Sequence, residues 1–99
     1  MINIEDIVYI ESENRECIIH TRNETYKESE TLNYFEEKLS KKHFFRIHKS
    51  FLINLKYIVE IYPWFNNTYC VKVSGFKDVF LPVSRNKIKE LKRILHIKQ

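Results

Sequence analysis

Short hydrophobic runs separated by polar clusters recur through most of the chain. β-Branched and aromatic residues dominate the runs, and Asn, Ser and charged residues fill the clusters, a pattern typical of strands joined by tight turns. The predicted strands are Ile7–Ile10, Cys17–Thr21, Thr25–Glu28, Phe44–His48, Tyr57–Tyr62, Thr68–Val73 and Val79–Val83. Because strands so close in sequence leave no room for parallel crossovers, the pattern predicts antiparallel sheets.

Helical periodicity replaces this pattern in two segments. The apolar residues of the first recur at intervals of three and four, and they are Leu32, Phe35 and Leu39. Ser29 or Thr31 can provide its N-cap. The second helix is predicted over Asn86–Ile97, with Ser84 as N-cap. The order of elements predicts a mainly β fold with one short internal helix and a C-terminal helix.

Length and composition favour one domain. A chain of 99 residues with 43% hydrophobic residues can build one compact core but not two. With one Gly, two Pro and no low-complexity stretch, no segment resembles a linker, so residues 1–99 are predicted to form a single domain. No apolar run approaches the roughly 20 residues that cross a bilayer, and the first residues do not resemble a signal peptide. We therefore expect a soluble, cytoplasmic protein without membrane contact.

Charge is distributed unevenly along the chain. Residues 1–40 carry 4 Lys and Arg against 10 Asp and Glu, whereas residues 41–99 carry 13 against 3. The basic part is a candidate surface for a polyanion, because cationic side chains that approach phosphates release condensed counterions. An ordinary solvated surface explains the charge equally well, so charge alone leaves both interpretations open.

Motifs for catalysis, metals and cofactors are absent from the sequence. His48 and Ser50 are two residues apart, but no oxyanion motif or orienting acid accompanies them. The four histidines lack metal-ligand spacing, and a single glycine cannot build a phosphate-binding loop. We expect no enzymatic activity, no metal site and no cofactor.

The two cysteines also favour an intracellular setting. Cys17 and Cys70 lie far apart without CxxC spacing, which is typical of half-buried strand residues in a reducing compartment. A redox-sensing thiol is the alternative, and it would need exposure and a lowered pKa.

Hydrogen-bond donors gather near the end of one predicted strand. Strand alternation places Phe45 and Ile47 on one face and predicts that Arg46, His48 and Ser50 share the other. With little acidity nearby, such donors suit phosphate oxygens and base edges. A structural alternative is that Arg46 or His48 pairs with a carboxylate such as Glu11.

A second donor-rich segment extends from Val83 to Asn86. It places Arg85 where a strand passes into a helix, a position that exposes the side chain and offers backbone N–H groups to anions. Arg is the residue type that pairs bidentately with guanine O6 and N7.

Several motifs occur in a recognisable order. They are Glu5–Glu11, His20–Thr21, Thr31–Leu32, Phe44–Leu55, Tyr57–Ile58 and Pro82–Arg85. The longest contains the specific pattern F-x-R-x-H-[RK]-S-[FY]-x-[VI]-N, from Phe44 to Asn54. Through these motifs nearly the whole chain resembles the LytTR domain, the DNA-binding module of many bacterial response regulators.

The resemblance implies an elongated fold of three small antiparallel sheets that binds DNA through loops reaching successive major grooves. It assigns base reading to four residues: Arg85, Asn14, Arg15 and Lys49. Phosphate contacts are expected from four others, which are His48, Ser50, Asn86 and Lys87. Asn54 and Thr21 are expected to fix a turn and a strand rather than to contact DNA.

The resemblance also implies partners. Family members usually bind double-stranded DNA as a pair on direct repeats and regulate transcription. A receiver domain or a sensor would lie outside these residues, so the chain is either an excised domain or a free-standing member. An alternative, suggested by the many aromatic residues, is a β module that binds RNA, single strands or protein.

Overall fold

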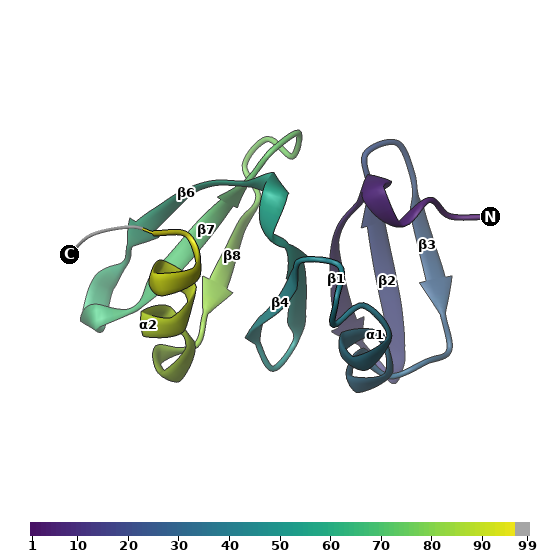
Figure 1. Cartoon of the computed structure of the whole chain (residues 1–99), viewed down its shortest axis with the longest axis horizontal. Helices are drawn as coiled ribbons and strands as arrows, with labels where there is room; N and C mark the ends of the chain where they lie inside the picture. Colours follow the sequence, from purple (N-terminus) through teal and green to yellow (C-terminus); the bar gives the residue numbers. More distant parts are fainter. Residues whose placement is uncertain (97–99) are drawn as a thin grey trace.

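The computed structural model describes residues 1–96, which form eight strands and two α-helices (Figure 1). The strands are β1 (Ile7–Glu13), β2 (Glu16–Thr21), β3 (Thr25–Glu28), β4 (Phe44–His48), β5 (Phe51–Asn54), β6 (Ile58–Pro63), β7 (Tyr69–Val73) and β8 (Phe80–Val83). The helices are α1 (Leu32–Lys38) and α2 (Arg85–Ile94), and the short 3₁₀ turns are η1 (Ile4–Asp6), η2 (Leu55–Tyr57) and η3 (Phe65–Asn67). The prediction of a mainly β fold with two helices is confirmed.

The structure corrects the prediction at two places, a missed strand and the limits of the second helix. β5 was not predicted as a strand of its own, although it follows β4 after a turn of only two residues. Helix α2 begins at Arg85 and ends at Ile94, with Leu95 as C-cap, and the predicted last residue, Ile97, lies outside the described residues. Ser84 is the N-cap by position, but its side chain makes no capping hydrogen bond.

Every strand pair is antiparallel. One sheet has five strands in the order β3-β2-β1-β5-β4, and the other has three in the order β6-β7-β8. The structure therefore has two sheets where the resemblance implied three. The reason is that β1 pairs with β5, with Tyr9 opposite Ile53, and thereby joins the β4–β5 hairpin to the first three strands.

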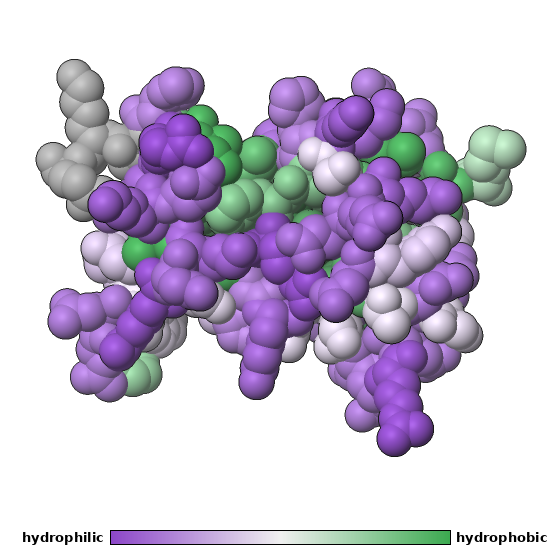
Figure 2. Space-filling view, turned by 60° about the horizontal axis from the view of Figure 1, so that its bottom comes forward, coloured by the Kyte–Doolittle hydropathy of each residue, from purple (hydrophilic) through white to green (hydrophobic). Residues whose placement is uncertain are grey.

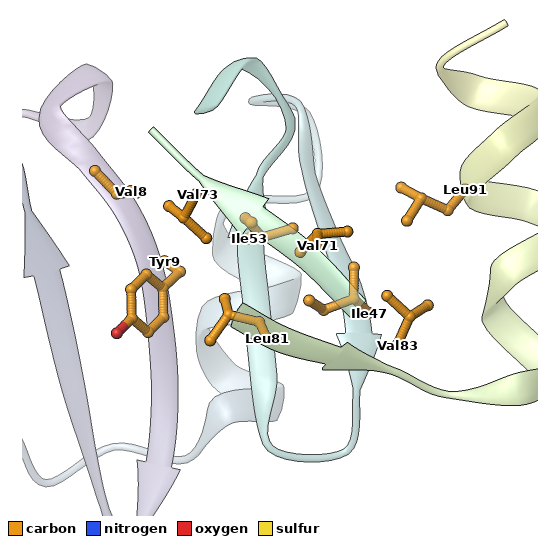
Figure 3. Packing of buried hydrophobic residues seen from close by; sticks show 9 residues of the cluster. All are labelled: Val8, Tyr9, Ile47, Ile53, Val71, Val73, Leu81, Val83 and Leu91. Atoms are coloured by element: carbon orange, nitrogen blue, oxygen red, sulfur yellow. The ribbon is translucent and has the colours of Figure 1, made fainter. Parts of the chain in front are cut away.

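The central part of the five-stranded sheet is buried on both faces, whereas the edge strand β3 is mostly exposed. Helix α1 covers one face, where Leu32 and Leu39 pack with Ile10, Ile19 and Leu52. The three-stranded sheet covers the other, in a cluster formed by Val8, Tyr9, Ile47, Ile53, Val71, Val73, Leu81, Val83 and Leu91 (Figure 3). This double burial explains why all residues from Ile7 to Ile10 are buried.

Both cysteines are buried more deeply than the sequence predicted. Cys17 is fully buried in β2, and Cys70 is buried in β7. Burial raises the pKa of each thiol above its ordinary value, which opposes thiolate formation. The structure thus favours the packing role over redox sensing.

Two further features concern residues 1–96 as described. No helix in this part of the chain is long and apolar enough to cross a membrane. Within the same residues, no group of three or more His, Cys, Asp or Glu side chains could hold a metal ion.

Replacing Ile47 should test how far the fold depends on its central hairpin. Ile47 is fully buried between the two sheets, so Ile47→Ala should lower the free energy of unfolding by about 2–5 kcal/mol through lost burial and a residual cavity. Urea unfolding followed by circular dichroism measures this, with Val59→Ala, at an exposed position of β6, as control. Equal losses of unfolding free energy in Ile47→Ala and Val59→Ala would contradict the central role of the hairpin in the fold.

Candidate nucleic-acid interface

Three turns with predicted contact residues lie along one edge of the molecule, the lower edge in Figure 1. They are the β1–β2 turn, the β4–β5 turn and the junction between β8 and α2. Backbone hydrogen bonds tie them together: Ser12 N donates to Ser50 O at 3.0 Å, and Ser84 N donates to Ile47 O at 2.8 Å. The turns therefore have fixed positions relative to one another.

The β1–β2 turn presents Asn14 and Arg15 at its tip. Glu13 pairs with Glu16, so only these two residues form the loop, and both have left-handed backbone conformations, with φ of 50° and 68°. Such a turn matches the twist of a hairpin, and Asn tolerates this conformation. Arg at the second position is disfavoured, and glycine is the usual choice. An exposed arginine therefore occupies the tip despite a local conformational cost.

Arg46 holds the β4–β5 turn in place. Its Nε donates to His48 O at 3.0 Å and its Nη2 to Lys49 O at 2.5 Å. Its Nη1 donates to Glu36 Oε1 and Asn33 Oδ1 of α1, both at 2.8 Å. With its side chain only 16% exposed, Arg46 is a positioning residue for the turn rather than a free donor.

The pairing of Arg46 answers an alternative that the sequence left open. Arg46 does pair with a carboxylate, but the partner is Glu36 rather than Glu11. Glu11 instead contacts His20, with 2.6 Å between Oε1 and Nε2. Sequence spacing did not reveal the partner, because it depends on how α1 packs against β4.

His48 does not share a face with Arg46, contrary to the prediction. A β-bulge between Arg46 and His48 breaks the alternation, because two steps along β4 correspond to one step along β5. Arg46 consequently faces α1, whereas His48 lines a groove together with Arg85 and Trp64.

The His48 ring is fixed by the turn that follows it. Ser50 N donates to His48 Nδ1 at 3.1 Å, so in the neutral ring the hydrogen is on Nε2. Burial, together with the charges of Lys49 and Arg46, lowers the pKa of His48 below its usual value. The lowered pKa favours the neutral ring, whose Nε2–H can donate a hydrogen bond. Lys49 is exposed at the tip of the turn.

Arg85 lies at the other end of the edge. It is exposed, and its Nη2 donates to Asn66 O at 2.7 Å; within residues 1–96 its other N–H groups have no hydrogen-bond partner. Asn86 is exposed beside it, whereas Lys87 is half-buried with its Nζ 5.7 Å from the Phe45 ring centre. The groove that Arg85 shares with His48 has a volume of about 500 Å³.

The structure brings all of the predicted contact residues to this edge. The β1–β2 turn supplies Asn14 and Arg15. The β4–β5 turn and the end of β4 supply His48, Lys49 and Ser50, and the start of α2 supplies Arg85, Asn86 and Lys87. Figure 2 brings the lower edge of Figure 1 forward and shows a predominantly hydrophilic surface. The prediction did not include Arg46 as a positioning residue or Asn66 as a neighbour of Arg85.

Thr21 and Asn54 have the structural roles that the sequence predicted. Thr21 Oγ1 donates to Glu24 O at 2.7 Å and stabilises the β2–β3 turn. Asn54 is buried, donates to Ile7 O at 3.0 Å and accepts from Lys56 N. Neither side chain is available to a ligand.

The lowered pKa of His48 predicts a pH dependence of stability. The folded state binds a proton at His48 less tightly than the unfolded state does. The contribution of His48 to the free energy of unfolding is therefore fully present above its ordinary pKa of 6.5 and is lost progressively as pH falls below that value. His48→Asn retains an acceptor for Ser50 N but cannot titrate. Urea unfolding between pH 7.5 and 5 should show a smaller decline for this variant, whereas parallel declines would contradict the prediction.

Known proteins resemble this chain over most of its length. Residues 1–96 match the family model of the LytTr DNA-binding domain. The transcriptional regulatory protein YpdB of Escherichia coli K12 is 43% identical over 94 residues, which are 95% of this chain and 38% of YpdB. The sensory transduction protein LytT of Bacillus cereus is 44% identical over 98 residues, 98% of this chain and 39% of LytT. The chain thus spans less than two fifths of the length of these relatives.

A solved structure shares the fold. It is the LytTr DNA-binding domain of a putative methyl-accepting/DNA response regulator from Bacillus cereus, with a TM-score of 0.83 and 24% sequence identity. The match covers 95% of this chain and 84% of that one. Family model, sequence and fold agree, and the chain belongs to the LytTr DNA-binding domain family.

Proposed function

We propose that this domain binds double-stranded DNA sequence-specifically through the three turns of its lower edge. In this proposal it is the output domain of a bacterial transcriptional regulator. The observation that carries the proposal is the convergence of the predicted contact residues on one edge, where backbone hydrogen bonds fix the three turns. Turns held on a rigid scaffold can present donors to DNA with little loss of entropy.

The dimensions of the molecule agree with a site that extends over one helical turn. Its principal extents are 40 × 27 × 24 Å, and a helical turn of B-DNA measures about 34–36 Å. The β1–β2 turn and the β8–α2 junction can then enter successive major grooves. The β4–β5 turn between them faces the intervening backbone or minor groove.

The side chains divide into base-reading and phosphate-binding groups. Arg85 and Arg15 have the planar donor groups that recognise guanine edges, and Asn14 has a carboxamide suited to adenine. Lys49 acts mainly as a point charge. His48 Nε2, Ser50, Asn86, Lys87 and the N-terminus of α2 are assigned to phosphates, which set register and affinity.

The assembly on DNA forms part of the same proposal. Two copies of the domain bind direct repeats along one face of the duplex. Regulatory input comes from a receiver domain or a sensor partner outside these residues, in keeping with relatives that are more than twice as long as the matched region.

Selection of preferred sites from random duplexes tests this function. The selected duplex should bind more tightly than scrambled DNA in fluorescence anisotropy, and binding to either duplex should weaken steeply as salt rises. Salt-insensitive binding, or a preference for single strands, would support the alternative β module that binds protein or RNA.

Arg85→Ala should reduce specificity more than affinity for DNA in general. Loss of a bidentate contact predicts roughly 5- to 150-fold weaker binding of the selected duplex, with little change for scrambled DNA. Arg22→Ala is the matched control, since Arg22 is an exposed arginine in the β2–β3 turn, away from the three contact turns. If the ratio between the affinities for the selected duplex and for scrambled DNA is unchanged in Arg85→Ala, Arg85 does not read a base.

Arg15→Gly separates stability from binding. Glycine suits the left-handed position of Arg15, so the free energy of unfolding should stay constant or rise by up to about 1 kcal/mol. Affinity for the selected duplex should nevertheless fall, because a donor and a positive charge are lost. Arg15→Ala should lose the same affinity and be the less stable variant. Unfolding and anisotropy measure both effects, and retained affinity in both variants would contradict the role of Arg15.

A further inference from the structure

A fourth turn lies at the same edge and is not among the predicted contacts. It connects β6 to β7 and consists of Trp64, Phe65, Asn66, Asn67 and Thr68. Figure 1 shows it at the lower left, near the start of α2. The hydrogen bond from Arg85 Nη2 to Asn66 O, 2.7 Å long, places the guanidinium directly against this turn.

The backbone of the β6–β7 turn is well fixed. Trp64 N donates to Thr68 O at 2.7 Å, and Thr68 Oγ1 donates to Phe65 O at 2.7 Å. Asn66 and Asn67 both have left-handed conformations, with φ of 60° and 59°. The two carboxamides are exposed, and no hydrogen-bond partner for them occurs among residues 1–96.

Two exposed aromatic side chains accompany these carboxamides. Phe65 is 70% exposed and Trp64 is 52% exposed, and their ring centres lie 6.1 Å apart. Trp64 also lines the groove that contains Arg85 and His48. Adjacent exposed aromatic residues are typical of a surface that a partner covers.

We propose that the β6–β7 turn is a further DNA-contacting element, in which Asn66 and Asn67 contact the base pairs adjacent to the one read by Arg85. The inference rests on the proposed function. The hydrogen bond from Arg85 Nη2 to Asn66 O makes the two asparagines immediate neighbours of the guanidinium, so base pairs beside the one read by Arg85 are the nearest for their carboxamides. Asn carboxamides recognise adenine N6 and N7, and a phenyl ring can contact the methyl group of thymine.

DNA is the occupant that the surroundings favour. The turn is continuous with the donor-rich edge through the hydrogen bond of Arg85, so a duplex bound there passes beside it. Its two carboxamides are neutral donors and acceptors, which suit base edges as well as phosphates. A protein partner is the competing occupant, and the experiments below distinguish it.

The double variant Asn66→Gly with Asn67→Gly tests the proposal. Glycine accommodates both left-handed conformations and retains the carbonyl that accepts from Arg85, so only the carboxamides are lost. Asp78→Gly is the matched control, since it makes a similar change at a left-handed position in the β7–β8 connection. Thermal unfolding verifies that all variants remain folded.

Binding is measured on the selected duplex and on a panel in which each base pair is changed singly. The double variant should bind the selected duplex at least about five-fold more weakly, and base preference should flatten next to the position that Arg85→Ala identifies. An unchanged base-preference profile in the double variant overturns the inference. The proposed function still stands in that case if Arg85→Ala removes the base preference at the position that Arg85 reads. If the wild-type domain prefers no duplex over scrambled DNA, both fail.

Trp64 provides an independent measurement, because it is the only tryptophan of the chain. Quenching of its fluorescence by acrylamide should decrease when the selected duplex saturates the domain, since bound DNA would cover the turn. Unchanged quenching at saturation means that the turn stays open to solvent in the complex, as expected if its partner is a protein, and would overturn the inference.

Discussion

Burial of the β4–β5 hairpin is the constraint on which the arrangement of the molecule depends. Ile47 and Ile53 fill the space between the two sheets, and Leu52 packs on the opposite side beneath α1. The same hairpin accepts the backbone hydrogen bonds that join its neighbours: Ser50 O accepts from Ser12 N of β1, and Ile47 O accepts from Ser84 N. A single apolar hairpin thus orders both the core and the edge where the turns meet.

The edge also concentrates features that oppose stability. Arg15 occupies a conformation that favours glycine, and His48, Lys49 and Arg46 place positive or donor groups close together. Pairing with Glu36 offsets part of this repulsion, and Arg46 also donates to two carbonyls of the β4–β5 turn, His48 O and Lys49 O. Local conformational cost and unneutralised charge at one edge, above a well-packed core, are expected where a polyanionic ligand completes the surface.

Sequence reasoning recovered the parts of the fold that local patterns encode. Strand composition located seven of the strands approximately, and apolar spacing located both helices, because each depends on residues close in sequence. β5 was missed because the motif around it continues through a two-residue turn. The number of sheets was misjudged since it depends on the pairing of β1 with β5, which no local pattern reveals.

The candidate site divides in the same way. Its exposed tips could be named from the sequence, because Lys49 and Arg85 lie within the family motifs and Asn14 and Arg15 lie in the polar turn between the first two predicted strands. The side on which His48 lies could not, since one bulge shifts the alternation of β4. The partner of Arg46 and the contact between Arg85 and Asn66 join residues 10 and 19 positions apart, so they follow from packing alone.

Presenting contacts on turns has a consequence for how specificity can change. The tips at Arg15, Lys49 and Arg85 are exposed, while the bonds that position them involve backbone atoms and the half-buried Arg46. Substituting a tip therefore removes a contact without opening the core, because little apolar area is lost. In the proposed mode of DNA binding, the domain can therefore alter which DNA it prefers while keeping its fold, provided that the central hairpin and the Arg46 network remain intact.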